Sequence, residues 1–367
     1  MNSNLKFLVL GGSGAMGREI VRELLSSPGV HVTVADTRTD FYDQYPPTWV
    51  KKYHRRLAWK KVDLLREPAK LVRFLRGHLA MVNATTHHLN LPAMKAALRA
   101  RVHYLDLGGL FHYTRKQLRL HRAFERKKRL AILGIGCAPG LSNLLAVHAA
   151  EGMERINSIE IRVGARSLAH RKMPRGVVEV PYAIGTIREE LTLKPWVFAR
   201  GRYHAMPART GKEKFPFPKP IGDQTVFYTL HSEVATLPAS FRSKGVRQVS
   251  FKIGFEEPLI RALLRPGKKT KFVMPTHVKD VEITCARVHG WKNGRKARVM
   301  AYAIVRSRAG VSAGTIDTAI PPAIVASMLP DIKKAGVFAP EQAVPVGRFL
   351  RRARSRGIRI RRVGGNR

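Results

Sequence analysis

The fold is decided near the N-terminus, where residues 5–17 read LKFLVLGGSGAMG. The first six of these residues are almost all apolar, which is typical of a short buried strand. Glycines follow at once, and residues 15–26 then place apolar side chains at helical spacing. Residues 30–35, VHVTVA, form a second strand. The order strand, glycine turn, helix, strand predicts a βαβ unit, which requires a parallel sheet and a right-handed crossover.

The alternation continues over about 135 residues, which favours a doubly wound parallel sheet of the Rossmann type. Further strands are predicted at 57–62, 80–84, 104–107 and 130–133, and helices at 67–75, 92–99 and 116–127. These elements define a predicted dinucleotide-binding domain over residues 1–137.

The pattern changes near residues 138–140, Ala-Pro-Gly. After one helix at 142–150, β-rich segments follow without regular helices between them, so a mixed α/β second domain with a largely antiparallel sheet is expected over 138–310. Its strands are predicted at 158–163, 225–229, 248–253, 281–288 and 297–306, with a long loop at 200–222. A helix is predicted at 313–328, entered through Ile320-Pro321-Pro322, and a helix and short strand are predicted in the tail.

Length and composition indicate a globular protein of two domains. The chain has 367 residues, is 44% hydrophobic, and has no apolar run long enough to span a bilayer. Cys137 and Cys285 are the only cysteines, and neither belongs to a His/Cys cluster. We therefore expect a cytoplasmic protein without a metal site.

The formal net charge of +42 is unusual. Such a charge attracts polyanions at low salt, but the basic residues are dispersed and no aromatic residues are interleaved with them for base stacking. A basic solvated surface is the favoured interpretation. A nucleic acid or another polyanion as a physiological partner remains the alternative.

The glycine loop has the features of a dinucleotide site. Gly12 permits the tight turn, Gly14 lets phosphate approach the backbone, and Gly17 lets the helix pack on the strand. Asp36 ends the next strand, 19 residues after Gly17, where a carboxylate accepts hydrogen bonds from ribose hydroxyls. This favours NAD, although Arg38 could pair with a 2′-phosphate and leaves NADP possible. The predicted cofactor residues in the loop are Gly12, Ser13, Gly14, Ala15, Met16 and Gly17.

Polar residues that follow later strands are further candidates. Asn83, Ala84 and Thr85 come directly after a strand and should approach the nicotinamide ribose, with His87 or His88 as a less favoured acid or base. Asp106 ends another strand before two glycines. Its carboxylate could hold an ammonium group or act as a base, or it could accept backbone hydrogen bonds that shape the turn.

Two candidates lie beyond residue 137. Residues 139–143, Pro-Gly-Leu-Ser-Asn, precede a helix, so Ser142 or Asn143 could be its N-cap. Alternatively Pro139 and Asn143 face the nicotinamide carboxamide or a substrate carboxylate. His231 and Glu233 follow a β-rich run, where histidine could relay a proton and the glutamate could orient it, or both could form a buried polar pair.

Seven stretches resemble the saccharopine dehydrogenase-like oxidoreductases, which include lysine 6-dehydrogenase. They occur in that family's order between residues 7 and 345. The most specific are YLDLGG (104–109), APGLSN (138–143) and HSEVATLP (231–238). The others are LVLGGSGAMGREIVREL, VNATTHHLNLPAMKAAL, AIPPAIVASML and GVFAPEQAVP.

The resemblance implies an NAD(P)-binding domain, a substrate domain, and a C-terminal segment, residues 311–367, that returns to the first domain. It also implies hydride transfer at the C–N bond of an amino acid or amine, with an imine formed and hydrolysed. Asp106, His231 and Glu233 are then the predicted catalytic residues. A homodimer formed through the second domain is expected. The alternative is a non-catalytic cofactor-binding protein with a polyanion partner.

Overall fold

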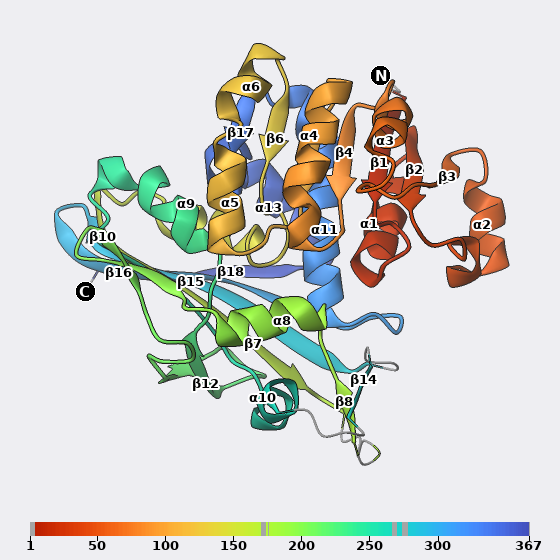
Figure 1. Ribbon diagram of the computed structural model, residues 1–367. Helices are drawn as coiled ribbons and strands as arrows, with labels where there is room; N and C mark the ends of the chain where they lie inside the picture. The colour runs from red at the N-terminus through yellow and green to blue at the C-terminus, as the bar shows by residue number, and fades with distance from the viewer. Residues whose placement is uncertain (1–3, 170–173, 175, 266–269, 274–277, 367) are drawn as a thin grey trace. The chain divides into compact units, whose positions relative to one another are not determined.

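The computed structural model describes residues 4–169, 174, 176–265, 270–273 and 278–366 (Figure 1). The chain divides into two compact units, each made from two stretches of sequence. The first contains residues 1–136 and 318–345, and the second contains residues 137–317 and 346–367. The sequence analysis assigned the whole of 311–367 to the first domain, but residues 346–367 cluster with the second unit.

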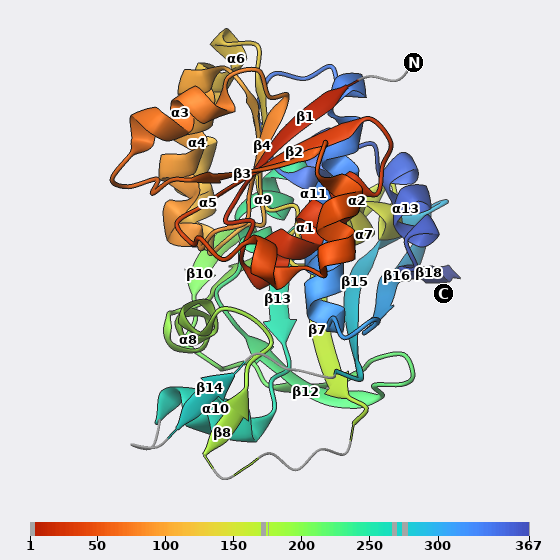
Figure 2. The same ribbon diagram turned by 90° about the vertical axis from the view of Figure 1, so that its right-hand side faces the viewer.

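The first unit is built on a seven-stranded parallel sheet with the order β17-β6-β5-β4-β1-β2-β3. Helices α3 and α4 cover one face of this sheet, and α1 lies on the other (Figure 2). The doubly wound fold predicted from the sequence is confirmed. The elements are β1 (Leu5–Leu10), α1 (Ala15–Leu25), β2 (Val30–Asp36), α2 (Pro47–Tyr53), β3 (Leu57–Lys61), α3 (Pro68–Leu75), β4 (Ala80–Asn83), α4 (Asn90–Ala100), β5 (His103–Asp106), α5 (Phe111–Leu118), α6 (His121–Arg126), β6 (Leu130–Ile132), β17 (Gly336–Phe338) and α12 (Pro340–Ala343).

The strand register brings the sequence-predicted cofactor residues to one edge of this sheet. Leu10, the last residue of β1, pairs with Ala35 in β2 and with Asn83 in β4, and Asn83 pairs with Asp106 in β5. The strands are parallel, so their carboxyl ends and the loops that follow them meet at this edge.

Some elements of the first unit differ from the prediction. The single helix expected at 116–127 is two helices, α5 and α6, because the chain turns at Arg119 and Leu120. The strand β17 comes from the C-terminal part of the chain and pairs with β6. Its three residues are too few to show a periodicity, so no pattern indicated it.

The second unit is built on a mixed sheet with the main order β10-β9-β13-β7-β15-β16-β18, in which only the β13–β7 pair is parallel. The largely antiparallel sheet predicted from the sequence is confirmed. The elements are α7 (Leu141–Ala149), β7 (Arg155–Ser167), β8 (Val177–Glu179), α8 (Ile184–Thr192), β9 (Trp196–Ala199), β10 (Arg202–Ala205), β11 (Glu213–Pro216), β12 (Asp223–Tyr228), α9 (Glu233–Ser240), β13 (Gln248–Ile253), α10 (Glu257–Leu264), β14 (Lys271–Val273), β15 (Asp280–Lys292), β16 (Arg295–Arg306), α13 (Val346–Ser355) and β18 (Arg359–Asn366).

The two faces of this sheet carry different side chains because side chains alternate along each strand. Phe251, Ile161 and Ala286 pair across β13, β7 and β15 and share one face. Helices α7 and α9 pack against these strands, and we call this the helix face. Arg162 pairs with Cys285 on the opposite face, where Phe215 of the β11–β12 hairpin packs in the same apolar cluster. We call that the hairpin face.

Helix α11 (Ala313–Met328) connects the two units and includes Pro321 and Pro322, which the sequence analysis placed at its entry. The predicted loop at 200–222 contains the short strands β10 and β11, and α8 was not predicted. Among the described residues, no helix is long and apolar enough to cross a membrane.

Candidate functional site

Packing within the protein leaves no room for a side chain at two positions of the glycine loop. A Cβ atom at Gly12 would lie 2.7 Å from Val34 Cγ1, and one at Gly17 would lie 2.2 Å from the Gly11 carbonyl oxygen. At Gly14, by contrast, only the Gly11 carbonyl oxygen lies within 4 Å, at 3.3 Å. The free side of Gly14 therefore leaves the backbone open to a phosphate, and Gly14 is also the N-cap of α1.

Ser13 gives an independent test of whether this loop fits a dinucleotide. Its side chain is 1% exposed, and its Oγ atom has no hydrogen-bond partner among the described residues. A buried hydroxyl without a partner is unfavourable, whereas a phosphate oxygen would accept a hydrogen bond from it. The loop thus fits a pyrophosphate at the start of α1.

Asp36 lies beside this loop at the end of β2. Its Oδ2 atom accepts a hydrogen bond from the Ser13 backbone N–H at 2.9 Å, and its Oδ1 atom accepts one from the Arg38 N–H at 3.1 Å. The Arg38 guanidinium instead makes a two-contact ion pair with Asp40. The carboxylate predicted to bind ribose is therefore next to the loop, and the arginine predicted to compete for a phosphate is paired with an acid.

Asn83, Ala84 and Thr85 border the same loop. A Cβ at Gly11 would lie 2.9 Å from Thr85 Cγ2 and 3.2 Å from the Ala84 carbonyl carbon. The Asn83 side chain donates to Asn90 Oδ1 and accepts from the Thr85 hydroxyl at 2.7 Å. Its side chain fixes the turn, so the backbone at 84–85 is the part available to a ligand.

Asp106 is fully buried and its acceptor positions are occupied. Its Oδ1 atom accepts from the backbone N–H groups of Gly108, at 2.9 Å, and Gly134, at 2.6 Å, and Oδ2 accepts from Gln117 Nε2 at 2.6 Å. Burial raises the pKa of this carboxyl even though these hydrogen bonds act in the opposite direction. The contacts favour the alternative in which Asp106 shapes the turn after β5.

In the second unit, the predicted residues His231 and Glu233 form one buried pair. His231 Nδ1 lies 2.5 Å from Glu233 Oε2, and the Ser142 hydroxyl donates to Glu233 Oε1 at 2.7 Å. The imidazole stacks on Phe251, with ring centroids 3.7 Å apart and planes inclined by 7°. Because Nδ1 is engaged with the carboxylate, Nε2 is the atom through which this histidine can exchange a proton.

The helix that carries Ser142 is fixed at its first turn. Asn143 Oδ1 accepts from the Gly140 N–H at 3.0 Å, so Asn143 closes the start of α7, and Pro139 precedes that turn. Ser142 is directed instead to Glu233. The expectation that Ser142 or Asn143 is the N-cap is wrong, because Gly140 is the N-cap and both residues lie within the first turn of α7. Asn143 closes that turn, and Ser142 holds the Glu233 carboxylate.

Glu190 and Tyr182 complete this group and were not found in the sequence. Glu190 Oε1 lies 3.9 Å from His231 Nε2, and Glu190 Oε2 accepts from the Tyr182 hydroxyl at 2.5 Å. They belong to α8 and the segment before it, where no motif indicated a site. One feature of the sequence could have drawn attention to this segment: two acidic residues, Glu189 and Glu190, stand side by side in a chain where acidic residues are scarce, 25 against 67 lysines and arginines.

The pKa values of Glu190 and His231 are both raised above their ordinary values. Burial raises the pKa of Glu190 to about 7, although His231 and the Tyr182 hydrogen bond act to lower it. Burial lowers the pKa of His231, but the charge and hydrogen bond of Glu233, with the charge of Glu190, outweigh it and raise the pKa overall. The geometry places His231 Nε2 and Glu190 Oε1, 3.9 Å apart, as a proton donor and acceptor.

A second acidic group lies on the same sheet face, around Cys137. The Cys137 thiol donates to Glu282 Oε1 at 3.5 Å and lies 3.1 Å from Thr284 Oγ1. One ligand atom from each of Cys137, Glu282 and Asp317 lies within 4.8 Å of the others. Burial raises the pKa of both carboxyls, and their mutual repulsion raises that of Asp317 further.

Comparisons with known proteins agree with the fold described above. Residues 7–132 match the family model of the saccharopine dehydrogenase NADP binding domain. The fold is similar to that of apo saccharopine dehydrogenase (L-Glu forming) from Saccharomyces cerevisiae, with 12% identity over 98% of this chain and 99% of that one and a TM-score of 0.74. It is equally similar to the homospermidine synthase of Legionella pneumophila, solved with NAD, with 10% identity over 98% and 91% and a TM-score of 0.74. The resemblance predicted from the motifs is confirmed.

Proposed function

We propose that this chain, whose first unit belongs to the saccharopine dehydrogenase family of NADP-binding domains, oxidises the C–N bond of an amine or amino acid with a nicotinamide dinucleotide. The cofactor class is supported by the family model and by the loop that fits a pyrophosphate. The donor class is supported by the second unit, where a histidine, two carboxyls and a hydroxyl are arranged to take a proton from nitrogen.

We further propose NAD as the preferred cofactor. Asp36 would accept hydrogen bonds from ribose hydroxyls, and its negative charge would repel a 2′-phosphate. Arg38, which could offset this charge, is paired with Asp40. When bound, the nicotinamide ring accepts a hydride from the carbon attached to the reacting nitrogen.

Side chains of this protein would remove the proton from the substrate nitrogen. An amine must be uncharged before hydride can leave the adjoining carbon, so a base must take its proton. His231 Nε2 can accept this proton and Glu233 stabilises the imidazolium through Nδ1. Glu190, 3.9 Å from Nε2, can then receive the proton, and later return one when water adds to the imine.

The pairing of His231 with Glu233, within reach of Glu190, is the observation that carries this proposal. Its test is the accumulation of reduced nicotinamide when the full chain is incubated with NAD or NADP and each of a set of amines and amino acids. We expect the substitution His231→Asn to lower kcat by about a hundredfold to ten-thousandfold while cofactor affinity is unchanged.

His289→Asn is the matched control, because His289 lies in the same unit on the hairpin face of the sheet, opposite Ser158. Glu233→Gln separates positioning from folding, because it should lower the pKa seen in the kcat profile by removing the charge that raises the pKa of His231. The proposal fails if no amine is oxidised by a protein that binds the cofactor, or if His289→Asn is as damaging as His231→Asn.

A second candidate function is binding of a polyanion, and one feature of the first unit favours it. A surface cavity of about 400 Å³ lies at the amino ends of β1, β2 and β3. Its lining contains four lysines and arginines, three histidines and no acid. If this is a physiological site, duplex or single-stranded nucleic acid should bind at physiological salt, with affinity that falls steeply as salt rises. The lysines, arginines and histidines of the lining are Lys6, His31, His54, Arg55, Arg56, Arg76 and His78.

A further inference from the structure

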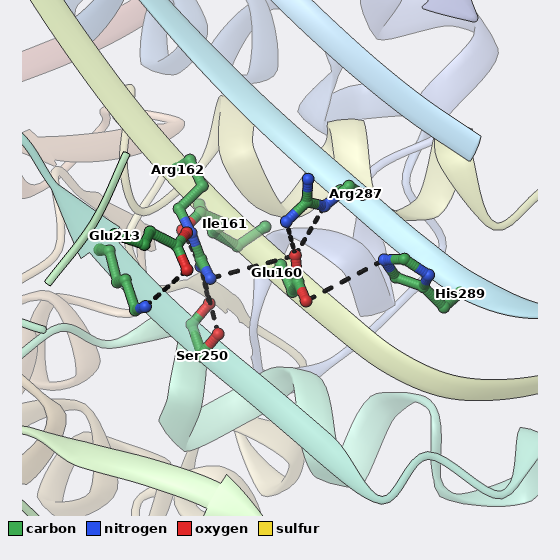
Figure 3. Close-up of polar contacts among 8 residues, drawn as sticks. Glu160, Ile161, Arg162, Glu213, Ser250, Arg287 and His289 are labelled. Atoms are coloured by element: carbon green, nitrogen blue, oxygen red, sulfur yellow. Dashed lines mark hydrogen bonds and ion pairs between the residues drawn. The ribbon is translucent and has the colours of Figure 1, made fainter. Parts of the chain in front are cut away.

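The hairpin face of the second sheet changes character between its centre and the edge at β18. At the centre, three basic side chains are paired with two glutamates, as Figure 3 shows. Arg162 and Lys252 both contact Glu213, at 2.5 and 2.7 Å, and Arg287 contacts Glu160 at 2.5 Å. Glu213 belongs to the β11–β12 hairpin, so the hairpin covers this part of the face and each of these three bases has an acidic partner.

Beyond Arg287 the same face is open on the last two strands, β16 and β18. Side chains alternate between the two faces, and burial along β16 follows that alternation. The odd-numbered residues 297–305, on the helix face, are all buried, whereas the even-numbered residues 296–306, on the hairpin face, are all partly or fully exposed. On β18, residues 359, 361 and 363 share the open face and are exposed. We call these even-numbered residues of β16 and these three residues of β18 the β16–β18 patch.

The patch has an apolar centre and a basic rim. Met300, Tyr302 and Ile304 are partly exposed at the margin of the apolar cluster under the hairpin, and Val363 is 44% exposed. Strands β16 and β18 contain no aspartate or glutamate. Among the described residues, no acid forms a hydrogen bond or ion pair with a basic side chain of the patch. Those basic side chains are Lys296, Arg298, Arg306, Arg359 and Arg361.

The strand register brings an aromatic ring among these basic side chains. Along the chain, Tyr302 is four residues from the nearest arginine on either side. In the sheet it pairs with Arg361, and Arg359 is the next residue of β18 on the same face. Alternate residues of a strand are about 6.7 Å apart, so both arginines lie close to the ring. The sequence analysis found no aromatic residue interleaved with the basic ones, and this does not hold for the patch, because the interleaving occurs across two strands.

This combination matches the chemistry of a single-stranded nucleic acid. Its phosphates pair with arginine, and its unpaired bases stack on exposed aromatic and apolar side chains. A duplex keeps the faces of its bases inside the helix and offers nothing to the apolar centre. A second copy of this chain would bring the same basic rim against itself, because a twofold interface uses the same surface of both copies.

We propose that the β16–β18 patch binds single-stranded nucleic acid, with phosphates held by Arg359 and Arg361 and a base stacked on Tyr302. This inference goes beyond the oxidation of an amine and does not depend on it. The patch lies on the hairpin face, whereas His231 stacks on Phe251 of the helix face. The patch also shares no residue with the basic cavity of the first unit.

The test measures binding of a labelled oligothymidylate to the full chain by fluorescence anisotropy over a range of salt concentrations. We expect binding at physiological salt, with a logarithm of affinity that falls linearly as the logarithm of salt concentration rises. The double substitution Arg359→Gln/Arg361→Gln should weaken binding about tenfold. It should also reduce the salt slope by about 1.4, because each phosphate contact to a single strand contributes about 0.7.

Arg351→Gln/Arg354→Gln is the matched control. It removes the same charge from the same C-terminal stretch, and both arginines are exposed. They belong to α13, which packs against α7, one of the helices that cover the opposite face of the sheet. This variant should bind oligothymidylate with nearly the affinity and salt slope of the native chain.

Tyr302→Leu separates stacking from charge. It keeps an apolar side chain at the margin of the cluster and removes the ring. It should weaken oligothymidylate binding about tenfold, because stacking of one base on an aromatic ring contributes about that factor. Binding of inorganic polyphosphate, which has the charge but no bases, should be unchanged, and an unchanged circular dichroism spectrum shows that the variant is folded.

Four results would overturn the inference. Equal weakening by the two double substitutions would mean that net charge, and not the patch, attracts the strand. If a duplex or polyglutamate binds as tightly as oligothymidylate, or if Tyr302→Leu has no effect, bases do not stack there. If Arg55→Gln/Arg76→Gln abolishes binding and Arg359→Gln/Arg361→Gln does not, the cavity of the first unit is the site. If the native chain is a dimer that Arg359→Gln/Arg361→Gln dissociates, the patch is an interface between copies. Amine oxidation is measured without nucleic acid, so none of these results decides the proposed function.

Discussion

Replacing Glu190 by glutamine should stabilise the second unit at alkaline pH while impairing its chemistry. Glu190 is 3% exposed, and burial raises its pKa from 4.5 to about 7. A group whose pKa is higher in the folded state contributes stability that is fully present below the unfolded pKa. This contribution is lost as pH rises through the folded pKa. The loss for Glu190 should therefore develop between pH 4.5 and about 7 and be complete above that.

The size of the effect follows from the shift. Each pKa unit corresponds to 1.36 kcal/mol, so the ionised Glu190 should cost about 3 kcal/mol of unfolding free energy above pH 8. Glu190→Gln does not titrate and can still accept the Tyr182 hydrogen bond. The difference in unfolding free energy between the variant and the native chain should therefore move by about 2.5 kcal/mol in the variant's favour between pH 5 and pH 8.

Urea denaturation of both proteins at several pH values measures this difference directly. Subtracting the two curves cancels groups whose pKa does not depend on Glu190. His231 is not among them, because the charge of Glu190 contributes to its raised pKa. Glu256→Gln supplies the control for an exposed glutamate, and its curve should run parallel to that of the native chain. A pH-independent difference between Glu190→Gln and the native chain would refute the reasoning, because it would mean that Glu190 has the same pKa folded and unfolded.

Two further predictions concern residues identified from the sequence. Asp36→Ala should weaken NAD more than NADP, by about tenfold, because it removes the acceptor for the ribose hydroxyls and the charge that opposes a 2′-phosphate; equal weakening, measured by calorimetry, would show that Asp36 does not contact the ribose. Asp106→Asn should lower the unfolding free energy by about 1–3 kcal/mol, because the amide cannot accept all three hydrogen bonds, while kcat of the folded variant changes by less than about tenfold. A hundredfold loss of kcat in a stable variant would instead make Asp106 a catalytic residue.

The first unit was predictable from the sequence because its signals are local. The glycine loop lies between a strand and a helix, and the parallel register then fixes which later residues share its edge, as it does for Asn83 and Asp106. The strand β17 was not predictable, since three residues from the far end of the chain carry no period. The division of residues 311–367 was not predictable either, because the pairing of β18 with β16 is a contact between strands far apart in the sequence that no local pattern shows.

Half of the candidate site in the second unit was predictable. His231 and Glu233 stand together in a motif, whereas Glu190 and Tyr182 reach them only through the packing of α8, and Cys137, Glu282 and Asp317 come from three separate elements. A sequence shows which residues are acidic, but alternation along a strand shows which face they occupy only once the register is known. Glu282 and Arg287 are five residues apart in β15 and therefore lie on opposite faces.

The separation of charge across this sheet gives the chain's basicity a different meaning. A net charge of +42 first suggests a protein surface that attracts polyanions at low salt. On the hairpin face of the second unit, however, Arg162 forms an ion pair with Glu213 and Arg287 forms one with Glu160. These arginines therefore do not neutralise the carboxyls of the helix face. The carboxyls of the helix face therefore create a local potential that the net charge of the chain does not describe. Exposed lysines and arginines that lie more than a Debye length from these carboxyls, about 8 Å at physiological ionic strength, are largely screened and do not determine the local potential there.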